Sequence, residues 1–316
     1  MEVSPEFSFV IPIYNEEKVF NQLVERLVAL ESKIDGVCEF ILVDDGSIDN
    51  SPVLIEHLSL NNSSFKGLFL SRNFGHQKAL SAGLDHVEGK YIMLIDADLQ
   101  DPPEMFFDFY RKIKEGFDVV YGIRKKRKEG FLKRAAYKTY YRFLNQVSNF
   151  KMPKDSGDFA MFTDSVAKAI NSNREEGRYL RGLRSWVGFN QIGLEYEREK
   201  RAAGEPSYTF KKLLELAFNG IMNFTTLPIK VLTITGASFI GVSFIYLIVV
   251  ILRKFIYNDV PSGFTALLFM IILFGGLQLL SLGIIGEYIQ RIFFQVKNRP
   301  LYVIKKKIKN SKIYYE

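Results

Sequence analysis

The sequence predicts an α/β fold with a mostly parallel sheet, followed by a transmembrane hairpin of two helices. In the first two thirds of the chain, short apolar segments that end in polar residues alternate with segments of helical periodicity. This alternation is typical of a parallel sheet whose strands are joined by helices. Nearer the C-terminus, two long uncharged segments follow one another, and each is long enough to cross a bilayer.

The composition excludes several classes of protein. Of the 316 residues, 47% are hydrophobic, which excludes a disordered chain. Cys38 is the single cysteine, which rules out an intramolecular disulfide framework and a cysteine-rich zinc module. With three histidines in the chain, a histidine-based metal site is not expected.

The apolar segments are predicted to be buried strands, and the segments between them helices. The strands are expected at Phe7–Tyr14, Glu39–Ser47, Gly67–Asn73, Tyr91–Gln100 and Asp118–Gly122. The helices are expected at Glu17–Leu30, at His76–Val87 and from Pro102 to about Lys114. Ligands of such sheets bind beyond the carboxyl ends of the strands, where both acidic clusters of this chain fall.

The two uncharged segments predict a membrane hairpin rather than buried helices of a soluble protein. The first, Val231–Leu252, would span ~33 Å as a helix, enough for a bilayer core. We therefore expect a soluble domain over residues 1–227 and membrane helices at about 229–252 and 260–286. A basic tail over residues 288–316 completes the predicted organisation.

Basic residues are concentrated in the tail, and they account for the whole net charge of +7. They are Arg291, Lys297, Arg299, Lys305, Lys306, Lys307, Lys309 and Lys312, against Glu316 alone. The positive-inside rule then predicts an integral protein of the cell's inner (plasma) membrane, with the soluble domain and both termini in the cytoplasm. Contact of the tail with anionic lipid is a second interpretation, compatible with the first.

The segment that carries Asp96 and Asp98 is the strongest candidate for chemistry. Strand side chains alternate, so two aspartates two residues apart would point the same way. Together they could hold Mg²⁺ or Mn²⁺, which would bridge a diphosphate and neutralise a leaving group. A structural alternative is that Asp98 or Asp101 caps the following helix.

A second candidate lies at the ends of the first two predicted strands. Tyr14 offers a flat face for a base, Asp45 could accept a hydrogen bond from it, and Glu16 could accept from ribose hydroxyls. Gly46 would let the backbone approach a ligand closely. Ordinary turn chemistry would also explain each of these residues taken alone.

Several motifs together resemble family 2 glycosyltransferases of the GT-A fold. Within that family the chain is similar to polyprenyl-phosphate glycosyltransferases, namely dolichyl-phosphate mannose synthases and bactoprenol glucosyltransferases. The motifs are VIPIYNEE at 10–17, VDDGSIDNS at 43–51, LSRNFGHQKALSAGLDHVEGKYIMLIDADLQDPPE at 70–104, YGIR at 121–124, SGDFAMF at 156–162, RGLRSWVGF at 181–189 and REKRAAGE at 198–205. The chain departs from the family after Glu205, where Pro206-Ser207 replaces the usual Ser-Lys or Thr-Lys; Lys211 or Lys212 could substitute for the missing lysine.

The resemblance implies roles for individual residues. It implies that the nucleotide sugar is bound by Pro12, Tyr14, Glu16, Val43, Asp45, Asp96 and Gln100. It implies that the metal and the diphosphate are contacted by Asp96, Asp98 and Gln100. The acceptor phosphate or donor diphosphate would face Arg124, Arg134 and Arg201. The catalytic residues would be Asp98, Asp158, Arg124 and Arg201, with Asp158 near the reacting sugar.

The predicted reaction transfers one hexose, with inversion, from a nucleotide sugar to a polyprenyl phosphate such as undecaprenyl phosphate. UDP-glucose is the first candidate donor, and a lipid-linked sugar for modification of cell-envelope glycans would be the product. Two alternatives are a processive polysaccharide synthase and a non-catalytic nucleotide-binding scaffold or flippase component. A processive synthase usually carries a Gln-x-x-Arg-Trp motif, which Arg184-Ser185-Trp186 does not match. A non-catalytic scaffold would not need Asp96, Asp98 and the arginines. The resemblance also implies a possible homo-oligomer.

Two stretches are predicted to be amphipathic helices beside the membrane, at about 128–150 and 208–227. The first belongs to a basic segment, from Arg124 to Arg142, with aromatic residues at helical spacing. This pattern suits a membrane interface that brings the active site to a lipid phosphate. A solvated charged face is the main alternative, and nucleic-acid binding is not expected.

Overall fold

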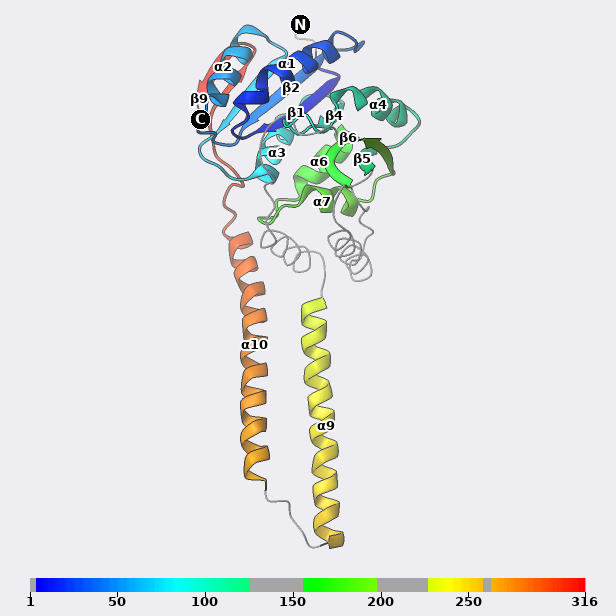
Figure 1. Ribbon diagram of the computed structural model, residues 1–316, viewed down its shortest axis with the longest axis vertical. Helices are drawn as coiled ribbons and strands as arrows, with labels where there is room; N and C mark the ends of the chain where they lie inside the picture. Colours follow the sequence, from blue (N-terminus) through cyan, green and yellow to red (C-terminus); the bar gives the residue numbers. More distant parts are fainter. Residues whose placement is uncertain (1–3, 126–155, 198–226, 258–262, 316) are drawn as a thin grey trace. The chain divides into compact units, whose positions relative to one another are not determined.

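The computed structural model of the chain describes residues 4–125, 156–197, 227–257 and 263–315 (Figure 1). The chain forms two compact units. The first, here called the sheet unit, comprises residues 1–145, 150–209 and 300–316. The second, the helical unit, comprises residues 146–149 and 210–299. Both predicted amphipathic helices, at about 128–150 and 208–227, lie essentially outside the described residues.

The described part of the sheet unit is an α/β fold built on one sheet of nine strands. The strands are β1 (Phe7–Ile13), β2 (Cys38–Asp44), β3 (Phe65–Leu70), β4 (Tyr91–Leu94), β5 (Val119–Lys125), β6 (Ser156–Thr163), β7 (Gln191–Glu197), β8 (Ile304–Lys309) and β9 (Lys312–Tyr315). Their order in the sheet is β7-β5-β6-β4-β1-β2-β3-β8-β9. The helices are α1 (Glu17–Glu31), α2 (Ser51–Asn61), α3 (His76–Leu84), the short 3₁₀ helix η1 (Pro103–Met105), α4 (Phe106–Lys114), α6 (Asp164–Ser172) and α7 (Leu180–Trp186).

The centre of the sheet is parallel, as predicted. β1 pairs in parallel with β2 and with β4, and β2 pairs in parallel with β3. Antiparallel pairing begins where β6 inserts between β4 and β5 and where β8 joins β3, so the sheet is mixed. Because β6 runs against its two neighbours, its first residues lie at the edge where β4 and β5 end.

Helices cover both faces of the sheet. On one face, α1, α2, η1 and α4 cover a core rich in aromatic rings, where Phe9 and Phe40 stack with their centroids 4.8 Å apart. On the other face, α3, α6 and α7 pack over Val10, Leu94 and Phe162. Residues that point to the two faces alternate along β1, because successive strand side chains point to opposite sides. This alternation explains why the whole of β1 is buried.

Several elements were not predicted. Helix α2 lacks a clear helical periodicity. β6 and α7 lie in segments that were read only for their motifs, and α6 and β7 lie between the motifs. The tail, predicted only to be basic, contains β8 and β9. β8 has the sequence IKKKIK and lies between β3 and the edge strand β9, with Ile304 and Ile308 buried; its high lysine content masked the apolar pattern.

The C-terminal segment is fastened to the sheet by apolar and ionic contacts. Leu301, Ile304 and Ile308 are at most 6% exposed. The Lys306 ammonium lies 2.6 Å from Glu56, and Lys309 pairs with Glu88. Glu88 also contacts Lys66, which pairs with the buried Glu39. The tail is therefore part of the sheet rather than an appendage.

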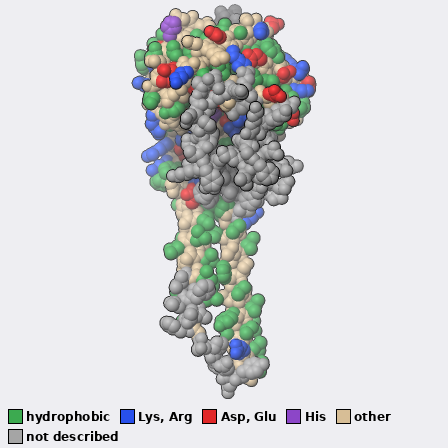
Figure 2. Space-filling model, in the orientation of Figure 1, with side chains coloured by type: hydrophobic (Ala, Val, Ile, Leu, Met, Phe, Trp, Pro, Cys, Tyr) green, Lys and Arg blue, Asp and Glu red, His purple; other side chains and the backbone are tan. Residues whose placement is uncertain are grey.

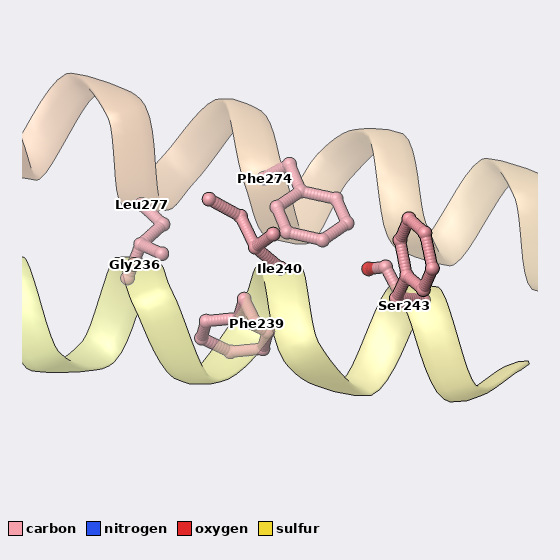
Figure 3. Close-up of a pocket in the computed structure, with 7 residues that line it drawn as sticks. Gly236, Phe239, Ile240, Ser243, Phe274 and Leu277 are labelled. Carbon is pink, nitrogen blue, oxygen red and sulfur yellow. The ribbon is translucent and has the colours of Figure 1, made fainter.

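The described part of the helical unit is a pair of long apolar helices, α9 (Leu227–Tyr257) and α10 (Phe264–Val296). Hydrophobic side chains cover much of the surface of both, as the green atoms in Figure 2 show. Phe239 and Phe274 meet edge to face between them, with ring centroids 5.5 Å apart. Beside this contact lies an open apolar groove in which Gly236 and Ser243 leave space between larger side chains (Figure 3).

One described helix is long and apolar enough to cross a membrane. It is the stretch Pro228–Arg253 of α9, which matches the first predicted span. The second predicted span, at 260–286, is helical from Phe264 onward but is not among the described candidates. One such helix is by itself weak evidence of membrane insertion.

Candidate active site

The predicted site residues gather at one edge of the sheet. β1, β2 and β4 are parallel and end side by side at this edge, so the segments after them meet there. β5 ends at the same edge, and β6 begins there because it is antiparallel. Pro12 and Val43 face each other in the β1–β2 ladder, while Arg124 is the last residue but one of β5 and Asp158 is the third residue of β6. Arg134 and Arg201 lie outside the described residues.

The loops after β1 and β2 are bound to each other. The Asn15 backbone N–H donates to Ser47 Oγ over 3.0 Å, and the Ile48 N–H donates to Asn15 Oδ1 over 2.9 Å. The Glu16 N–H donates in turn to Ser51 Oγ over 3.0 Å. These reciprocal bonds fix the loop on which the Tyr14 ring, 45% exposed, faces outward.

Asp45 has a structural task in this loop cluster. Its two carboxylate oxygens accept the backbone N–H groups of Phe74 and Gly75 over 2.8 and 2.9 Å. Burial raises the pKa of Asp45, and these two hydrogen bonds oppose that rise. Asp45 thus holds the turn that starts α3, and it keeps lone pairs for a ligand. Gly46, at φ +69°, is needed here because a Cβ would lie 2.5 Å from the Arg72 backbone.

The segment with Asp96 and Asp98 differs from the predicted strand. β4 ends at Leu94, so both aspartates lie in the turn beyond it rather than on alternating strand positions. Leu99 takes a left-handed backbone (φ 57°), and the Gln100 N–H donates to Asp98 Oδ1 over 3.1 Å. The prediction that strand alternation aligns the two carboxylates is therefore wrong. The Asp96 side chain is 23% exposed and Asp98 is 8% exposed.

The side chains around Asp96 could hold a metal ion only if the substrate supplies further oxygen ligands. Among the described residues, no group of three or more histidine, cysteine or acidic side chains is arranged to hold an ion alone. Two carboxylates with the Gln100 amide match the way Mg²⁺ is bound, since it usually keeps waters and takes substrate phosphate oxygens as further ligands. The residues present are compatible with such a shared site.

Asp101 holds Arg124 at the site. Asp101 is fully buried, accepts a hydrogen bond from the Tyr196 hydroxyl and lies 3.8 Å from the Arg124 guanidinium. Arg124 Nε also donates to Tyr196 over 3.3 Å. Gly157 makes room for this arginine, because a Cβ there would lie 3.0 Å from its Nη2. Asp101 is therefore a positioning group, in addition to any capping of the helix that follows.

Asp158 is held by a fork of hydrogen bonds. Arg181 Nε and Nη2 each donate to one of its carboxylate oxygens over 3.0 Å, and Gln77 Nε2 donates over 3.0 Å. Gln77 is itself fixed, since its Oε1 accepts the Leu180 N–H over 2.8 Å. Burial alone would raise the pKa of Asp158, but Arg181 and His76 hold it well below its usual range.

His76 lies between the two acidic groups of the site. Its Nε2 is 3.5 Å from Asp96 Oδ1 and 3.5 Å from Asp158 Oδ2. Although desolvation opposes it, the hydrogen bond with Asp158 and the charge on Asp96 raise the pKa of His76 to about 9. His76 begins α3, as the sequence suggested, but its two partners are distant in sequence and no local pattern revealed them.

Sequence reasoning missed most of the positioning residues. Gln77, Arg181 and Tyr196 each touch a predicted site residue, yet none stands in a recognisable local motif of charges. Gln77 and Arg181 could have been found from their place within the motif blocks at 70–104 and 181–189, which were read without a role for either residue. Tyr196 lies between the blocks at 181–189 and 198–205, and no signal in the sequence pointed to it.

The residues 8–170 match the family model described as "Glycosyl transferase family 2". The chain belongs to this family. It is therefore a glycosyltransferase, which makes the family resemblance of the motifs a confirmed prediction.

The relatives agree with this assignment over nearly the full length. The chain is 40% identical to the uncharacterized glycosyltransferase YkcC of Bacillus subtilis, covering 98% of this chain and 97% of that protein. It is 35% identical to the SfII prophage-derived bactoprenol glucosyl transferase of Shigella flexneri (95% and 98% covered) and to the prophage bactoprenol glucosyl transferase homolog of Escherichia coli K12 (95% and 99% covered). The protein is thus related to bactoprenol glucosyl transferases.

Solved structures resemble the chain more distantly. Glucosyl-3-phosphoglycerate synthase of Mycobacterium tuberculosis, in complex with Mn²⁺ and uridine-diphosphate-glucose, matches with a TM-score of 0.43 and 16% identity. The match covers 68% of this chain and 76% of that one. A likeness at this level indicates nothing about the metal or sugar of this protein.

Proposed function

We propose that the protein transfers a hexose from a nucleotide sugar to a polyprenyl phosphate, with inversion at the anomeric carbon. UDP-glucose and undecaprenyl phosphate are the first candidate substrates, by analogy with the bactoprenol glucosyl transferases to which the chain is related. The observation that carries the proposal is the gathering of Asp96, Asp98, Arg124 and Asp158 at one sheet edge, next to the exposed ring of Tyr14.

Each group at this edge has a task in the proposed reaction. Tyr14 stacks on the base, and Asp45 and Glu16 bind the nucleoside. Asp96, Asp98 and Gln100 hold Mg²⁺ or Mn²⁺, which supplies positive charge for the departing diphosphate. Arg124, held by Asp101 and Tyr196, faces phosphate oxygens, for which a guanidinium is well suited. Arg134 and Arg201 complete the phosphate contacts in this proposal.

The proposed site does not need a general base. A phosphate monoester has its second pKa near 6, so the acceptor is largely dianionic at neutral pH and can attack directly. Asp158, with its pKa held low by Arg181 and His76, is a poor proton acceptor near pH 7. We therefore assign Asp158 the orientation of the sugar.

Membrane insertion by both long helices is part of the proposal. β8, which follows α10 along the chain, pairs with β3, which precedes α9. The segments before α9 and after α10 must therefore lie on the same side of any bilayer. If α9 crosses the membrane, α10 must cross it in return. This requirement supports a two-helix anchor, with the sheet unit and both termini in the cytoplasm as the basic C-terminal segment suggests.

The deciding experiment is a transfer assay on the full chain in detergent. Undecaprenyl phosphate is incubated with a panel of nucleotide sugars and Mg²⁺ or Mn²⁺, and the lipid product is identified by mass. A single new lipid-phosphate-hexose, lost with EDTA, is the expected result and names the sugar. Absence of any lipid product, despite binding of a donor, contradicts the proposal.

Substitution of Asp158 separates an orienting group from a base. We expect Asp158→Asn to lower kcat by about tenfold, less than the 10²–10⁴-fold that loss of a general base costs. The activity of the variant should still fall below about pH 6, because the acceptor phosphate gains a proton there. A larger loss of kcat together with disappearance of this acid limb would show that Asp158 acts as the base.

A further inference from the structure

Helix α7 presents two arginines, one turn apart, to the beginning of β6. Arg181 binds the Asp158 side chain, as described above. Arg184 Nη1 donates to the backbone carbonyl of Gly157, the residue before Asp158, over 3.3 Å. The Arg184 guanidinium also lies over the Tyr121 ring, 4.8 Å from its centroid. The two arginines therefore hold both the side chain of Asp158 and the backbone that leads to it.

Arg184 is buried without an acidic partner. It is 3% exposed, and neither its Nε nor its Nη2 finds an acceptor, while no described carboxylate forms an ion pair with it. Burial lowers the pKa of Arg184 to about 10, which leaves the side chain charged at neutral pH. A buried charge with unmade hydrogen bonds destabilises a fold. Its presence calls for a reason other than stability.

The neighbours of Arg184 supply such a reason. Asp158 is the acidic group whose charge acts most strongly on Arg184. In a low-dielectric interior this attraction is much stronger than in water. Arg184 therefore favours the ionised, fixed form of Asp158 together with Arg181, and its bond to Gly157 sets the direction in which Asp158 leaves the strand.

We propose that Arg184 is a positioning residue of the active site. It fixes the first residues of β6 and favours the ionised form of Asp158, although its own burial lowers the stability of the fold. The inference rests on the proposed function, because it concerns the same transfer reaction. Arg184 touches no substrate in this account and acts through Gly157 and Asp158.

The test compares Arg184→Met with a matched variant of the full chain. Methionine fills a similar volume without charge, so removal of an unsatisfied guanidinium should leave Tm unchanged or raise it. We expect kcat to fall about tenfold or more, since small displacements of a positioning group are costly, while KM for the nucleotide sugar changes little. Arg184→Lys, which keeps the charge, should recover part of the lost kcat.

Arg178 provides the matched control. It is 5% exposed, its Nε and Nη1 also lack acceptors, and it bonds instead to the Ile170 carbonyl and to Asn171. Arg178→Met therefore removes a similar buried charge away from Asp158, and its kcat should equal that of the wild type. The double variant Arg184→Met/Asp158→Asn should lose little more kcat than Asp158→Asn alone, because both changes act on one group.

The outcomes separate the two proposals. Wild-type protein without transferase activity overturns the proposed function. An active wild type with kcat unchanged in Arg184→Met overturns the inference about Arg184 alone. A fall of kcat that is accompanied by a fall of Tm, and is additive with Asp158→Asn, shows a merely structural role and also overturns the inference.

Discussion

Asp98→Asn should abolish nearly all transferase activity and leave the fold intact. Asparagine has the same shape, and its side-chain oxygen can still accept the Gln100 N–H that Asp98 Oδ1 accepts now. The substitution removes only the charge that the proposed metal site needs at the departing diphosphate. We expect kcat to fall about 10³-fold, which corresponds to ~4 kcal/mol of lost transition-state stabilisation. Transfer kinetics with saturating Mg²⁺ and the Tm of the variant are the measurements.

The matched control for this change is Asp108→Asn. Asp108 lies on α4 with a half-exposed side chain that pairs with Arg111 one turn away, 2.7 Å apart. Such a surface pair contributes little to stability, so this variant should behave as the wild type. Retention of more than a tenth of wild-type activity by Asp98→Asn would contradict its assignment to the metal and diphosphate.

Removal of residues 300–316 should unfold or aggregate the sheet unit. The truncation deletes the buried side chains of Leu301, Ile304 and Ile308, worth about 2 kcal/mol each, or ~6 kcal/mol together. That loss is comparable to the whole stability of a typical domain. It also uncovers β3, whose unpaired backbone groups would become a template for association with other chains. The yield of monodisperse protein in detergent and its thermal unfolding are the readouts.

A shorter truncation isolates the contribution of β8. A stop codon in place of Ser311 removes β9, whose residues are all exposed, and leaves β8 paired with β3. We expect this variant to purify normally, with Tm lowered by a few degrees at most. If the chain ending at Arg299 has a similar Tm, then the C-terminal segment does not stabilise the sheet unit, and our account of it is wrong.

The predictable parts of the fold have local signals. β1, β2 and β3 were predicted because each is an apolar run closed by a polar turn, and α9 because it contains the long uncharged segment Val231–Leu252. β8 escaped prediction because a strand with four lysines and two isoleucines has no excess of apolar residues. The end of β4 was placed too late because Ile95, Ala97 and Leu99 are buried and extend the apolar pattern past Leu94, the last residue of β4 that pairs with β1.

The predictable parts of the site follow the same logic. Asp96, Asp98 and Asp45 stand directly after strands, and parallel strands end at a common edge, so their gathering could be expected. Arg124 and Asp158 were found only because motifs of a known family contain them. Their roles as predicted stay proposals, together with those of Arg134 and Arg201.

The family, the α/β architecture and the strand-end carboxylates could be read from the sequence alone, because these depend on periodicity and on order along the chain. The partners of these residues follow from contacts in the folded chain. Arg181 reaches Asp158, and Tyr196 reaches Asp101, only because β6 and β7 are placed beside β4 and β5 by long-range pairing. Hydrogen bonds and charges act over a few ångströms in space, and distance along the chain does not report them. Only the folded chain therefore shows the protonation and orientation of Asp158. It also shows that a segment beyond the apolar helices adds β8 and β9 to the sheet.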